Sequence, residues 1–360
     1  MTTSLDASTL PLLARGTAVL GAGGGGDPKV GLVVALQSVE DHGAVPLLDV
    51  ADLDPEGLVM PCGMIGAPTV HIEKYVNGDE GNRLREHLES LWGRPVVALM
   101  CAEIGGSNGL LPVAWAARLG LPLADADGMG RAFPLVPQLS MNIAGIPACP
   151  SVMTDERGNV IVFRSVSGEW LERMARAAVV EFGGAGSATE YAMTADQAKR
   201  ATVLHTVSLA LGIGAAIESA AKDPVETLID YLGAFRLIGG KVLDVERHTS
   251  KGFVRGSVVL QGLDLDEGRF VRLEIQNENL VALEGGKLLA SVPDLITLLD
   301  SESADAVVTE RIRYGQKVTA IAFPCNPLWR TPAGLELAGP RAFGYDFDYV
   351  RVEDIANARG

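Results

Sequence analysis

The sequence predicts an α/β N-terminal domain followed by a mostly β C-terminal domain. The chain has 360 residues, which exceeds the ~250–300 residues at which a single hydrophobic core stops growing. From Gly16 to about Ile229, apolar runs alternate with helical periodicity, as in a sheet covered by helices. After Asp230, short runs of Val, Ile, Leu and Phe are interrupted by Gly and Asn, a pattern typical of strands and turns. We therefore predict domains over residues 1–230 and 231–360, and the segment from Thr331 onward is able to return to the first domain.

The first half contains well-marked elements. Asp27 followed by Pro28 is a strong helix start, because Asp caps backbone N–H groups and Pro suits the first turn. The predicted helices are Pro28–Glu40, Gly81–Leu91, Leu110–Leu119, Glu169–Phe182 and Ala195–Ala220. We expect Gly212 and Gly214 to break or loosen the last of these helices. The predicted strands are Val45–Leu48, Leu58–Met60, Val96–Met100 and Val160–Arg164.

The second half is predicted to be built from short strands joined by tight turns. Turn-forming residues stand at Asp266–Gly268 and Glu284–Gly286, where Asp and Gly favour reversals of the chain. The predicted strands are Phe253–Leu260, Phe270–Gln276, Leu280–Leu283, Lys287–Ala290, Ala306–Thr309 and Lys317–Phe323.

Composition limits the classes of partner. The formal net charge is −15 and no basic run offsets it, so we expect no nucleic-acid partner. The four cysteines are scattered without paired spacing, which favours reduced thiols over a disulfide scaffold or zinc ribbon. The N-terminus has no signal-peptide pattern, and no run approaches the ~18 apolar residues that cross a bilayer. We expect a cytoplasmic protein without a membrane partner.

The first candidate site is the glycine loop Gly21–Gly26, which has a GxGxxG spacing and leads into a helix. Its backbone N–H groups could face an anion, and Gly24 and Gly25 would lie closest to a bound ligand. Asp49 follows the next strand at a distance loosely like that of a dinucleotide fingerprint. Asp27, however, places a negative charge where a pyrophosphate would bind. A tight turn or a carboxylate cradle is the alternative to nucleotide binding.

The second candidate is the loop Pro61–Val70 after a predicted strand, where open α/β sheets commonly bind ligands. Cys62 is a candidate nucleophile or soft metal ligand, and Thr69 is a candidate substrate contact. His71, just beyond the loop, is a candidate imidazole ligand. The alternative is that Cys62 packs in the core and His71 lies on the surface.

The third candidate combines Glu103–Asn108 with Asp125–Arg131, because each segment places carboxylates at the end of an apolar run. Glu103, Asp125 and Asp127 would meet at one edge of the sheet. Carboxylates in a shared pocket repel one another unless a cation or shared protons stabilise them. The segment is therefore a candidate metal or acid–base site, and Arg131 could neutralise one acid. Ordinary turn and cap residues are the alternative.

Two further features stand outside these loops. His205 lies within the predicted helix Ala195–Ala220, where it could line a site or be satisfied in the core. Gln276–Asn279 interrupts a strand pattern with four polar residues, which form either a polar wall of a cleft or a turn. The sequence has no GxSxG, HExxH or GxxxxGK[ST] motif, so serine-hydrolase, zincin and P-loop chemistry have no support.

Several of these stretches together resemble the S-methyl thiohydantoin desulfurase family, which is found beside or fused to hydantoinase/oxoprolinase-type proteins. The most specific is Asp125–Arg131, which reads DADGMGR. The others are Gly21–Asp27, Gly66–Val70, Glu103–Asn108, Asp125–Phe133, Gln276–Glu278, Val292–Ile296 and Arg341–Tyr345. The resemblance extends over nearly the whole chain.

The resemblance implies zinc-assisted hydrolysis that removes a thiol from a hydantoin-like five-membered ring. Metal-bound hydroxide would attack C2 and the intermediate would expel methanethiolate, while a carboxylate takes the proton of the water. By chemistry, we assign Glu103 or Asp127 as the base. The expected metal ligands are Asp125, His205 and Cys62, and the expected substrate contacts are Asn108, Arg131, Gly24, Gly25, Thr69, Asn277 and Glu278.

Two other functions remain open from the sequence. The chain could be a non-catalytic accessory subunit of a hydantoinase/oxoprolinase complex, in which the carboxylate loops shape an interface. It could also be a nucleotide-dependent enzyme that uses the Gly21–Gly26 loop. In each case we expect a homo-oligomer.

Overall fold

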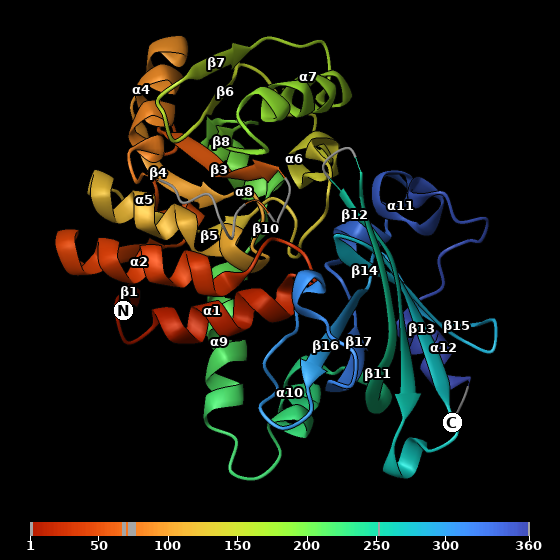
Figure 1. Cartoon of the computed structure of the whole chain (residues 1–360). Coiled ribbons are helices and arrows are strands. Elements are labelled where there is room, and N and C mark those ends of the chain that lie inside the picture. The colour runs from red at the N-terminus through yellow and green to blue at the C-terminus, as the bar shows by residue number, and fades with distance from the viewer. Residues whose placement is uncertain (1–2, 67–69, 71–76, 251–252, 359–360) are drawn as a thin grey trace.

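The computed structural model describes every residue except 1–2, 67–69, 71–76, 251–252 and 359–360. Figure 1 shows two sheets, one flanked by helices and the other formed by long antiparallel strands. The predicted combination of an α/β N-terminal domain with a mostly β C-terminal domain is confirmed. The predicted boundary near residue 230 lies between the last strand of the first sheet, which ends at Leu204, and the first strand of the second, which begins at Phe235.

The first sheet is mixed. Strands β2, β5, β4 and β3 run parallel, whereas β1, β8, β6 and β7 extend the sheet antiparallel at its two edges. In spatial order the strands are β1 (Thr3–Leu5), β2 (Val45–Leu48), β5 (Leu123–Asp127), β4 (Val96–Cys101), β3 (Leu58–Gly66), β8 (Ala185–Thr189), β6 (Ser151–Thr154) and β7 (Val160–Phe163). Two short strands pair outside this order: β9 (Met193–Thr194) with β3, and β10 (Val203–Leu204) with β5.

Helices cover this sheet and connect the two halves. The helices are α1 (Leu10–Leu20), α2 (Pro28–His42), α4 (Glu80–Trp92), α5 (Leu111–Leu119), α6 (Ser140–Ile143), α7 (Gly168–Glu181), α8 (Ala195–Ala201), α9 (Thr206–Glu218) and α10 (Pro224–Leu232). As predicted, the Asp27 carboxylate caps α2 by accepting a hydrogen bond from the Lys29 N–H at 3.0 Å.

The second sheet is antiparallel throughout. Its order is β15 (Lys287–Ser291), β14 (Glu278–Glu284), β13 (Phe270–Gln276), β12 (Phe253–Gly262), β11 (Phe235–Ser250), β17 (Lys317–Phe323) and β16 (Leu295–Asp300). Helix α12 (Val352–Asn357) packs on this sheet near the end of the chain, whereas α11 (Pro332–Ala338) lies against the loop that contains Val136. The segment after Thr331 therefore contacts both halves.

The structure differs from two predicted elements, and it contains a long strand that was not predicted. The helix predicted over Ala195–Ala220 is two helices, α8 and α9, separated by β10 and by His205 in the left-handed backbone region at φ 63°. Ala306–Thr309 is not a strand, because Ala306 forms only a single bridge with Leu299. The long strand β11 was not predicted, since Gly239 and Gly240 interrupt its apolar pattern.

Gly214 serves close packing and does not break α9. A Cβ atom at Gly214 would lie 2.0 Å from the Leu12 carbonyl oxygen of α1, and one at Gly16 would lie 1.8 Å from the Ala210 carbonyl oxygen. The two helices therefore touch backbone to backbone at both glycines. A Cβ atom at Gly212 would instead meet only the hydroxyl tip of Tyr231, a half-exposed side chain that can move aside.

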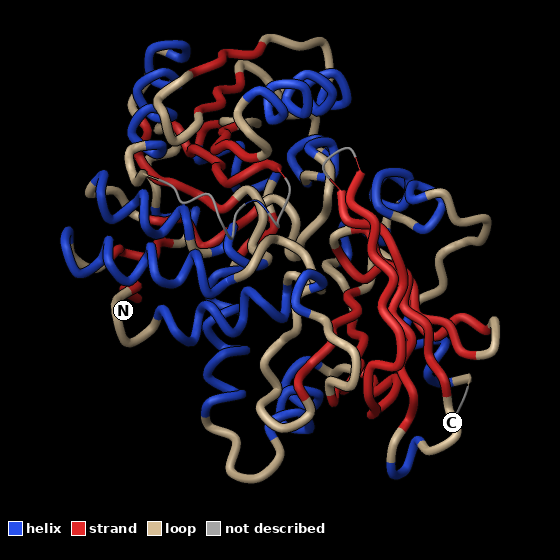
Figure 2. The backbone as a smooth tube through the Cα atoms, viewed as in Figure 1, coloured by secondary structure: helices blue, strands red, loops and turns tan. Residues whose placement is uncertain are grey.

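The two halves are joined by backbone hydrogen bonds across the glycine loop. The N–H groups of Asn279 and Thr309 donate to the carbonyls of Ala22 and Gly23 at 2.8 and 3.0 Å. The Trp329 indole N–H donates to the Met129 carbonyl at 2.6 Å. The tube view in Figure 2 shows loops of the first half lying against the edge of the second sheet. Segments far apart in sequence are thus fixed together at this junction.

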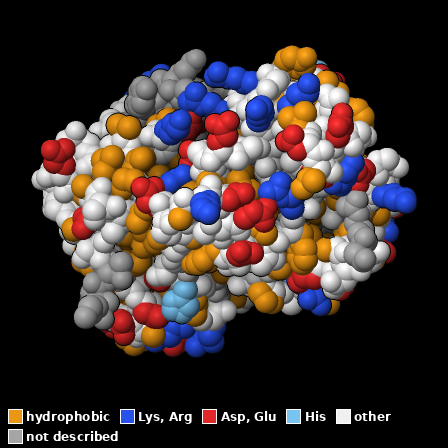
Figure 3. Space-filling model, turned by 90° about the horizontal axis from the view of Figure 1, so that it is seen from below, with side chains coloured by type: hydrophobic (Ala, Val, Ile, Leu, Met, Phe, Trp, Pro, Cys, Tyr) orange, Lys and Arg blue, Asp and Glu red, His pale blue; other side chains and the backbone are white. Residues whose placement is uncertain are grey.

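The surface carries a mixture of charges. On the face shown in Figure 3, acidic and basic side chains are interspersed with apolar ones, and the described residues form no continuous basic area there. In the portion of the chain that the structure describes, no helix combines the length and apolarity needed to cross a membrane.

The contact between α1 and α9 generates a stability prediction. The Gly214→Ala substitution is expected to lower the free energy of unfolding by about 1–3 kcal/mol, because the new methyl group collides with the backbone of α1. The matched control is Gly212→Ala in the same helix, which removes a glycine without a backbone collision and is expected to be neutral or stabilising by up to ~1 kcal/mol. Chemical denaturation measures both. Equal destabilisation by the two substitutions would contradict this packing account.

Candidate functional site

A cavity of about 710 Å³, including its open mouth, lies where the first sheet meets the second. Strands β3 and β4 point their carboxyl ends at it, and the segment after β5 and the start of β14 complete its walls. Carboxyl ends of neighbouring parallel strands meet at one edge of an α/β sheet, which is where such sheets bind ligands. The cavity is therefore the leading candidate site within the described residues.

Glu103 follows β4 and lines this cavity. The Asn108 side-chain amide donates a hydrogen bond to Glu103 Oε1, whereas Oε2 is buried and has no hydrogen-bond partner among the described residues. Burial raises the pKa of Glu103 to about 8, and the charge of Asp127 adds to this rise, while the Asn108 hydrogen bond opposes it. A carboxyl group of this kind can exchange a proton near neutral pH.

Asn108 fixes the position of Glu103. Its side-chain oxygen accepts the Met64 N–H at 2.8 Å, and its amide nitrogen donates to the Met64 carbonyl at 3.2 Å. Asn108 itself lies in the tight turn Gly106–Gly109, which precedes α5. The amide therefore connects the end of β3 to Glu103 and holds one carboxylate oxygen in place.

Glu278 enters the cavity from the second half of the chain, at the first residue of β14. It is 2% exposed, and its Oε2 atom is buried without a hydrogen-bond partner among the described residues. Burial raises its pKa well above the ordinary value; repulsion from Glu103 adds to the rise and attraction to Arg131 opposes it. Glu103 and Glu278 are thus coupled carboxyl groups in one cavity.

Glu190 reaches the same cavity from the end of β8. Burial raises its pKa to about 7, and the charge of Glu172 adds to the rise. Sequence reasoning missed Glu190, because β8 has the weakly apolar sequence AGSAT and was not predicted as a strand. The only sequence signal for Glu190 was its place as a single carboxyl residue after a run of small residues.

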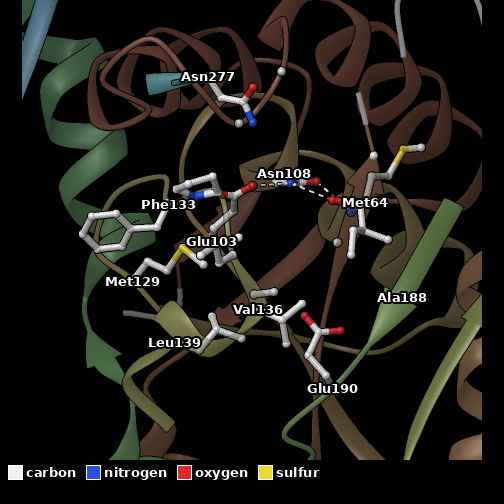
Figure 4. A pocket seen from close by; sticks show the side chains of 18 of the residues that line it. Met64, Glu103, Asn108, Met129, Phe133, Val136, Leu139, Ala188, Glu190 and Asn277 are labelled. Carbon is white, nitrogen blue, oxygen red and sulfur yellow. Dashed lines mark hydrogen bonds between the residues drawn. The ribbon is translucent and has the colours of Figure 1, made fainter. Parts of the chain in front are cut away.

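The remaining wall of the cavity is largely apolar. Figure 4 shows these side chains around Glu103 and Glu190, with Asn277 at the far side from Glu190. The labelled apolar side chains are those of Met64, Met129, Phe133, Val136, Leu139 and Ala188. An apolar enclosure with a few convergent polar groups is the usual form of a small-molecule site.

Asp127 and Arg131 lie next to the cavity and stabilise the segments that form its walls. Asp127 is fully buried and accepts hydrogen bonds from the backbone N–H groups of Ile104, Met129 and Gly130 at 2.8–3.0 Å. Arg131 donates to the backbone carbonyls of Pro293 and Asp294 at 2.6 and 3.0 Å. Neither side chain lines the cavity. Asp127 therefore joins the loops after β4 and β5, and Arg131 joins the two halves.

The structure does not bring the three predicted metal ligands together. The Asp125 carboxylate accepts hydrogen bonds from the backbone N–H and the hydroxyl of Ser208 at 3.0 and 2.6 Å, at the start of α9. His205 is exposed, with its Nδ1 3.6 Å from Asp125 Oδ2. Cys62 is buried inside β3, where burial raises its thiol pKa. Among the described residues, no group of three His, Cys, Asp or Glu side chains could hold a metal ion.

Within the described residues, Glu103, Asp125 and Asp127 are not brought together around one point, and the binding of a metal stays a prediction. Each of the three has separate partners: the Asn108 amide, the start of α9, and the backbone of the β4 and β5 loops. The zinc ligand set that was predicted does not fit this arrangement, since its thiol lies within a strand and its imidazole lies at the surface.

Other residues of the protein fill the space beside the Gly21–Gly26 loop. A Cβ atom at Gly24 would lie 2.2 Å from Glu278 Oε1, and one at Gly25 would lie 2.1 Å from the Gly105 carbonyl oxygen. Asp27, at the helix start, pairs with Arg311 at 2.6 Å. The loop is therefore packed against Glu278 of the second half and against Gly105, which leaves no space for a phosphate at Gly24 or Gly25.

Several predicted substrate contacts do meet at the cavity. Its lining includes the predicted residues Gly25, Glu103, Asn108, Asn277 and Glu278. Gly24 lies directly behind Glu278. Thr69 and His71 lie outside the described residues. The roles assigned to these side chains remain predictions.

The proteins of known family or structure that match this chain extend over both halves, and the boundary between the two family models, at residues 165 and 166, falls within the first sheet. The N-terminal domain model of the S-Me-THD-like proteins matches residues 8–165, and the C-terminal domain model matches residues 166–352. A protein from Chromobacterium violaceum, known from an X-ray crystal structure, is 25% identical, with a TM-score of 0.80. The match covers 97% of this chain and 100% of that protein. No curated protein matches the chain.

The two family models adjoin and together extend over almost the whole chain, and the solved structure matches both halves in one alignment. The family resemblance deduced from the sequence is thereby confirmed. The chain belongs to the S-Me-THD-like family, the family of S-methyl thiohydantoin desulfurase, and carries both of its domains.

Proposed function

We propose that this protein is a hydrolase that removes methanethiol from S-methyl thiohydantoin rings in the cavity between its two halves. Family membership suggests a desulfurase-like role. The observation that carries the hydrolytic proposal is Glu103, whose raised pKa and unpartnered buried oxygen lie at the cavity wall. General-base catalysis needs a group of this kind within reach of water.

In the proposed reaction, ionised Glu103 takes a proton from water while the water oxygen bonds to C2 of the ring. A neutral Glu278 donates its proton to the adjacent ring nitrogen, so that no full negative charge develops on the ring. The C2–S bond then breaks with its electron pair on sulfur. The sulfur takes the proton held by Glu103, and the C2 hydroxyl gives its proton to Glu278 as C2 becomes a carbonyl. The products are the hydantoin and methanethiol.

The two carboxyl groups suit these opposite roles because their surroundings differ. Asn108 stabilises the charged form of Glu103 through a hydrogen bond. Glu278 is more strongly buried, and repulsion from Glu103 favours its protonated form. Titratable pairs whose environments push their pKa values apart are typical of acid–base sites.

Replacing Glu103 with Gln tests the base. We expect turnover of an S-methyl thiohydantoin, followed by a colorimetric assay of the released thiol, to fall by ~10²–10⁴-fold, the usual worth of general-base catalysis. Glu40→Gln provides a control, because Glu40 is an exposed residue at the end of α2 and undergoes the same change of charge. Wild-type turnover in the Glu103 variant would remove Glu103 from the mechanism.

The raised pKa of Glu103 also predicts two pH dependences. Because the base must be ionised, kcat/KM should increase as pH rises through about 8, and this increase should be absent in Glu103→Gln. The folded state holds this proton between the ordinary pKa of 4.5 and about 8, so the free energy of unfolding contributed by Glu103 falls as pH rises across that window. The melting temperature of Glu103→Gln relative to wild type should therefore rise from pH 5 to pH 8.5. A constant difference would show that the carboxyl titrates normally.

A further inference from the structure

We propose that Arg131 is a positioning residue for proton transfer, which stabilises the anion that Glu278 becomes when it donates its proton to the ring nitrogen. This inference rests on the proposed function, because it concerns a carboxyl group of the same site. It follows from the way Arg131 is held, from the acidic groups around it, and from the change of charge during the proposed reaction.

Arg131 is a buried cation that is fixed by neutral groups. Its side chain is 0% exposed, its Nε donates to the Ala132 carbonyl at 3.0 Å, and its Nη1 donates to the carbonyls of Pro293 and Asp294. Its Nη2 atom is buried without a hydrogen-bond partner among the described residues. Burial lowers the pKa of Arg131 to about 10. The guanidinium group therefore has a fixed place, but none of these partners balances its charge.

Two of the acidic groups near Arg131 do not balance this charge either. The Asp294 carboxylate pairs with Arg330 at 2.6 Å and accepts a hydrogen bond from the Tyr349 hydroxyl at 2.8 Å. Burial raises the pKa of the Cys325 thiol to about 12, so the thiol is neutral at neutral pH. The acidic groups that remain are the two carboxyl groups of the cavity.

Of these two, Glu278 is the group that can use the charge of Arg131. It has the largest electrostatic effect on Arg131, and Glu103 has a smaller one. The Glu278 Oε2 atom is buried without a partner within the described part of the chain, whereas the Asn108 amide already stabilises the anion of Glu103. The charged groups with the largest effects on Glu278 are two acids, Glu103 and Glu310, and one cation, Arg131.

The effect of Arg131 depends on the protonation state of Glu278. While Glu278 holds its proton, the buried guanidinium has no free anion beside it. When Glu278 donates the proton to the ring nitrogen, the new carboxylate meets a cation that is already in place in a poorly solvated space. An interaction that strengthens as the transition state forms accelerates the reaction. Arg131 does not line the cavity, so it acts through Glu278 and does not touch the substrate.

A ¹³C NMR titration of Glu278 tests this pairing without turnover. The titration uses the Glu103→Gln background, so that the neighbouring carboxyl does not titrate together with Glu278, and Glu278→Gln assigns the resonance. Adding Arg131→Gln should move the midpoint of Glu278 to higher pH by at least about one unit, because the cation that favours the anion is lost. Adding Arg131→Lys keeps a cation and should give a smaller shift. An unchanged midpoint in Arg131→Gln would overturn the pairing.

Steady-state kinetics test the effect on the reaction. In the otherwise wild-type protein, Arg131→Gln should lower kcat by roughly tenfold or more with little change in KM, since one pH unit corresponds to a tenfold change in proton affinity. Arg131→Lys should recover part of this loss. The matched control is Trp329→Phe, which removes another hydrogen bond of the junction without a change of charge. It should lower stability and leave the Glu278 midpoint unchanged, and an equal shift in this control would show that Arg131 has only a structural role.

The wild-type protein decides the matter if Arg131→Gln does not fold. The ¹⁵N guanidinium resonance of Arg131 should move as Glu278 titrates, and this movement should be absent in Glu278→Gln. Movement that persists in Glu278→Gln, or no movement at all, would overturn the pairing. A shifted Glu278 midpoint in a protein that releases no methanethiol would support the pairing and contradict the proposed function. Release of methanethiol with an unshifted midpoint would contradict the role of Arg131 alone.

Discussion

The burial of carboxyl groups at the junction of the two halves is the constraint on which the site depends. A carboxylate loses its hydration when it is buried, and without a cation it responds by holding its proton to higher pH. Glu103, Glu190 and Glu278 all respond in this way, with burial as the largest cause. The same burial that makes all three groups costly to fold makes Glu103 and Glu190 able to exchange protons near neutral pH.

The close approach of the two halves creates this burial. Glu278 can lie against the glycine loop only because Gly24 has no side chain. The carbonyls of Ala22 and Gly23 then bind the backbone of the second half, while Arg131 and Trp329 secure the opposite side of the junction. A Cβ atom at Gly23 would likewise meet Thr309 and Asn279 of the second half, so Gly23 and Gly24 both serve the close contact between the halves.

The sequence predicted the fold class and much of the cavity, for reasons that can be traced to particular residues. Local signals were sufficient where an element is amphipathic and capped, as in α2 with Asp27. They also located Glu103 and Asn108, because these residues follow the strongly apolar strand β4. Asn277 and Glu278 were found because they interrupt a strand pattern. Each of these signals lies within a few residues of the feature that it predicts.

The features that the sequence did not predict depend on contacts between segments that are far apart along the chain. Asp125 and Asp127 have the composition of a metal site, yet one caps α9 and the other accepts backbone hydrogen bonds from its surrounding loops. Gly214 resembles a helix breaker until the backbone of α1 is placed against it. Glu190 belongs to a strand of small residues whose pairing with β3 and β6 is fixed only by the fold.

The most direct test of this account is a titration of the glutamate side chains by ¹³C NMR, with Glu103→Gln used to assign the resonance of Glu103. The Glu103 carboxyl is expected to titrate near pH 8 in the unliganded wild-type protein. A titration midpoint near the ordinary value of 4.5 would show that the carboxyl is solvated and ionised at neutral pH, and it would contradict the proposed proton-exchanging site.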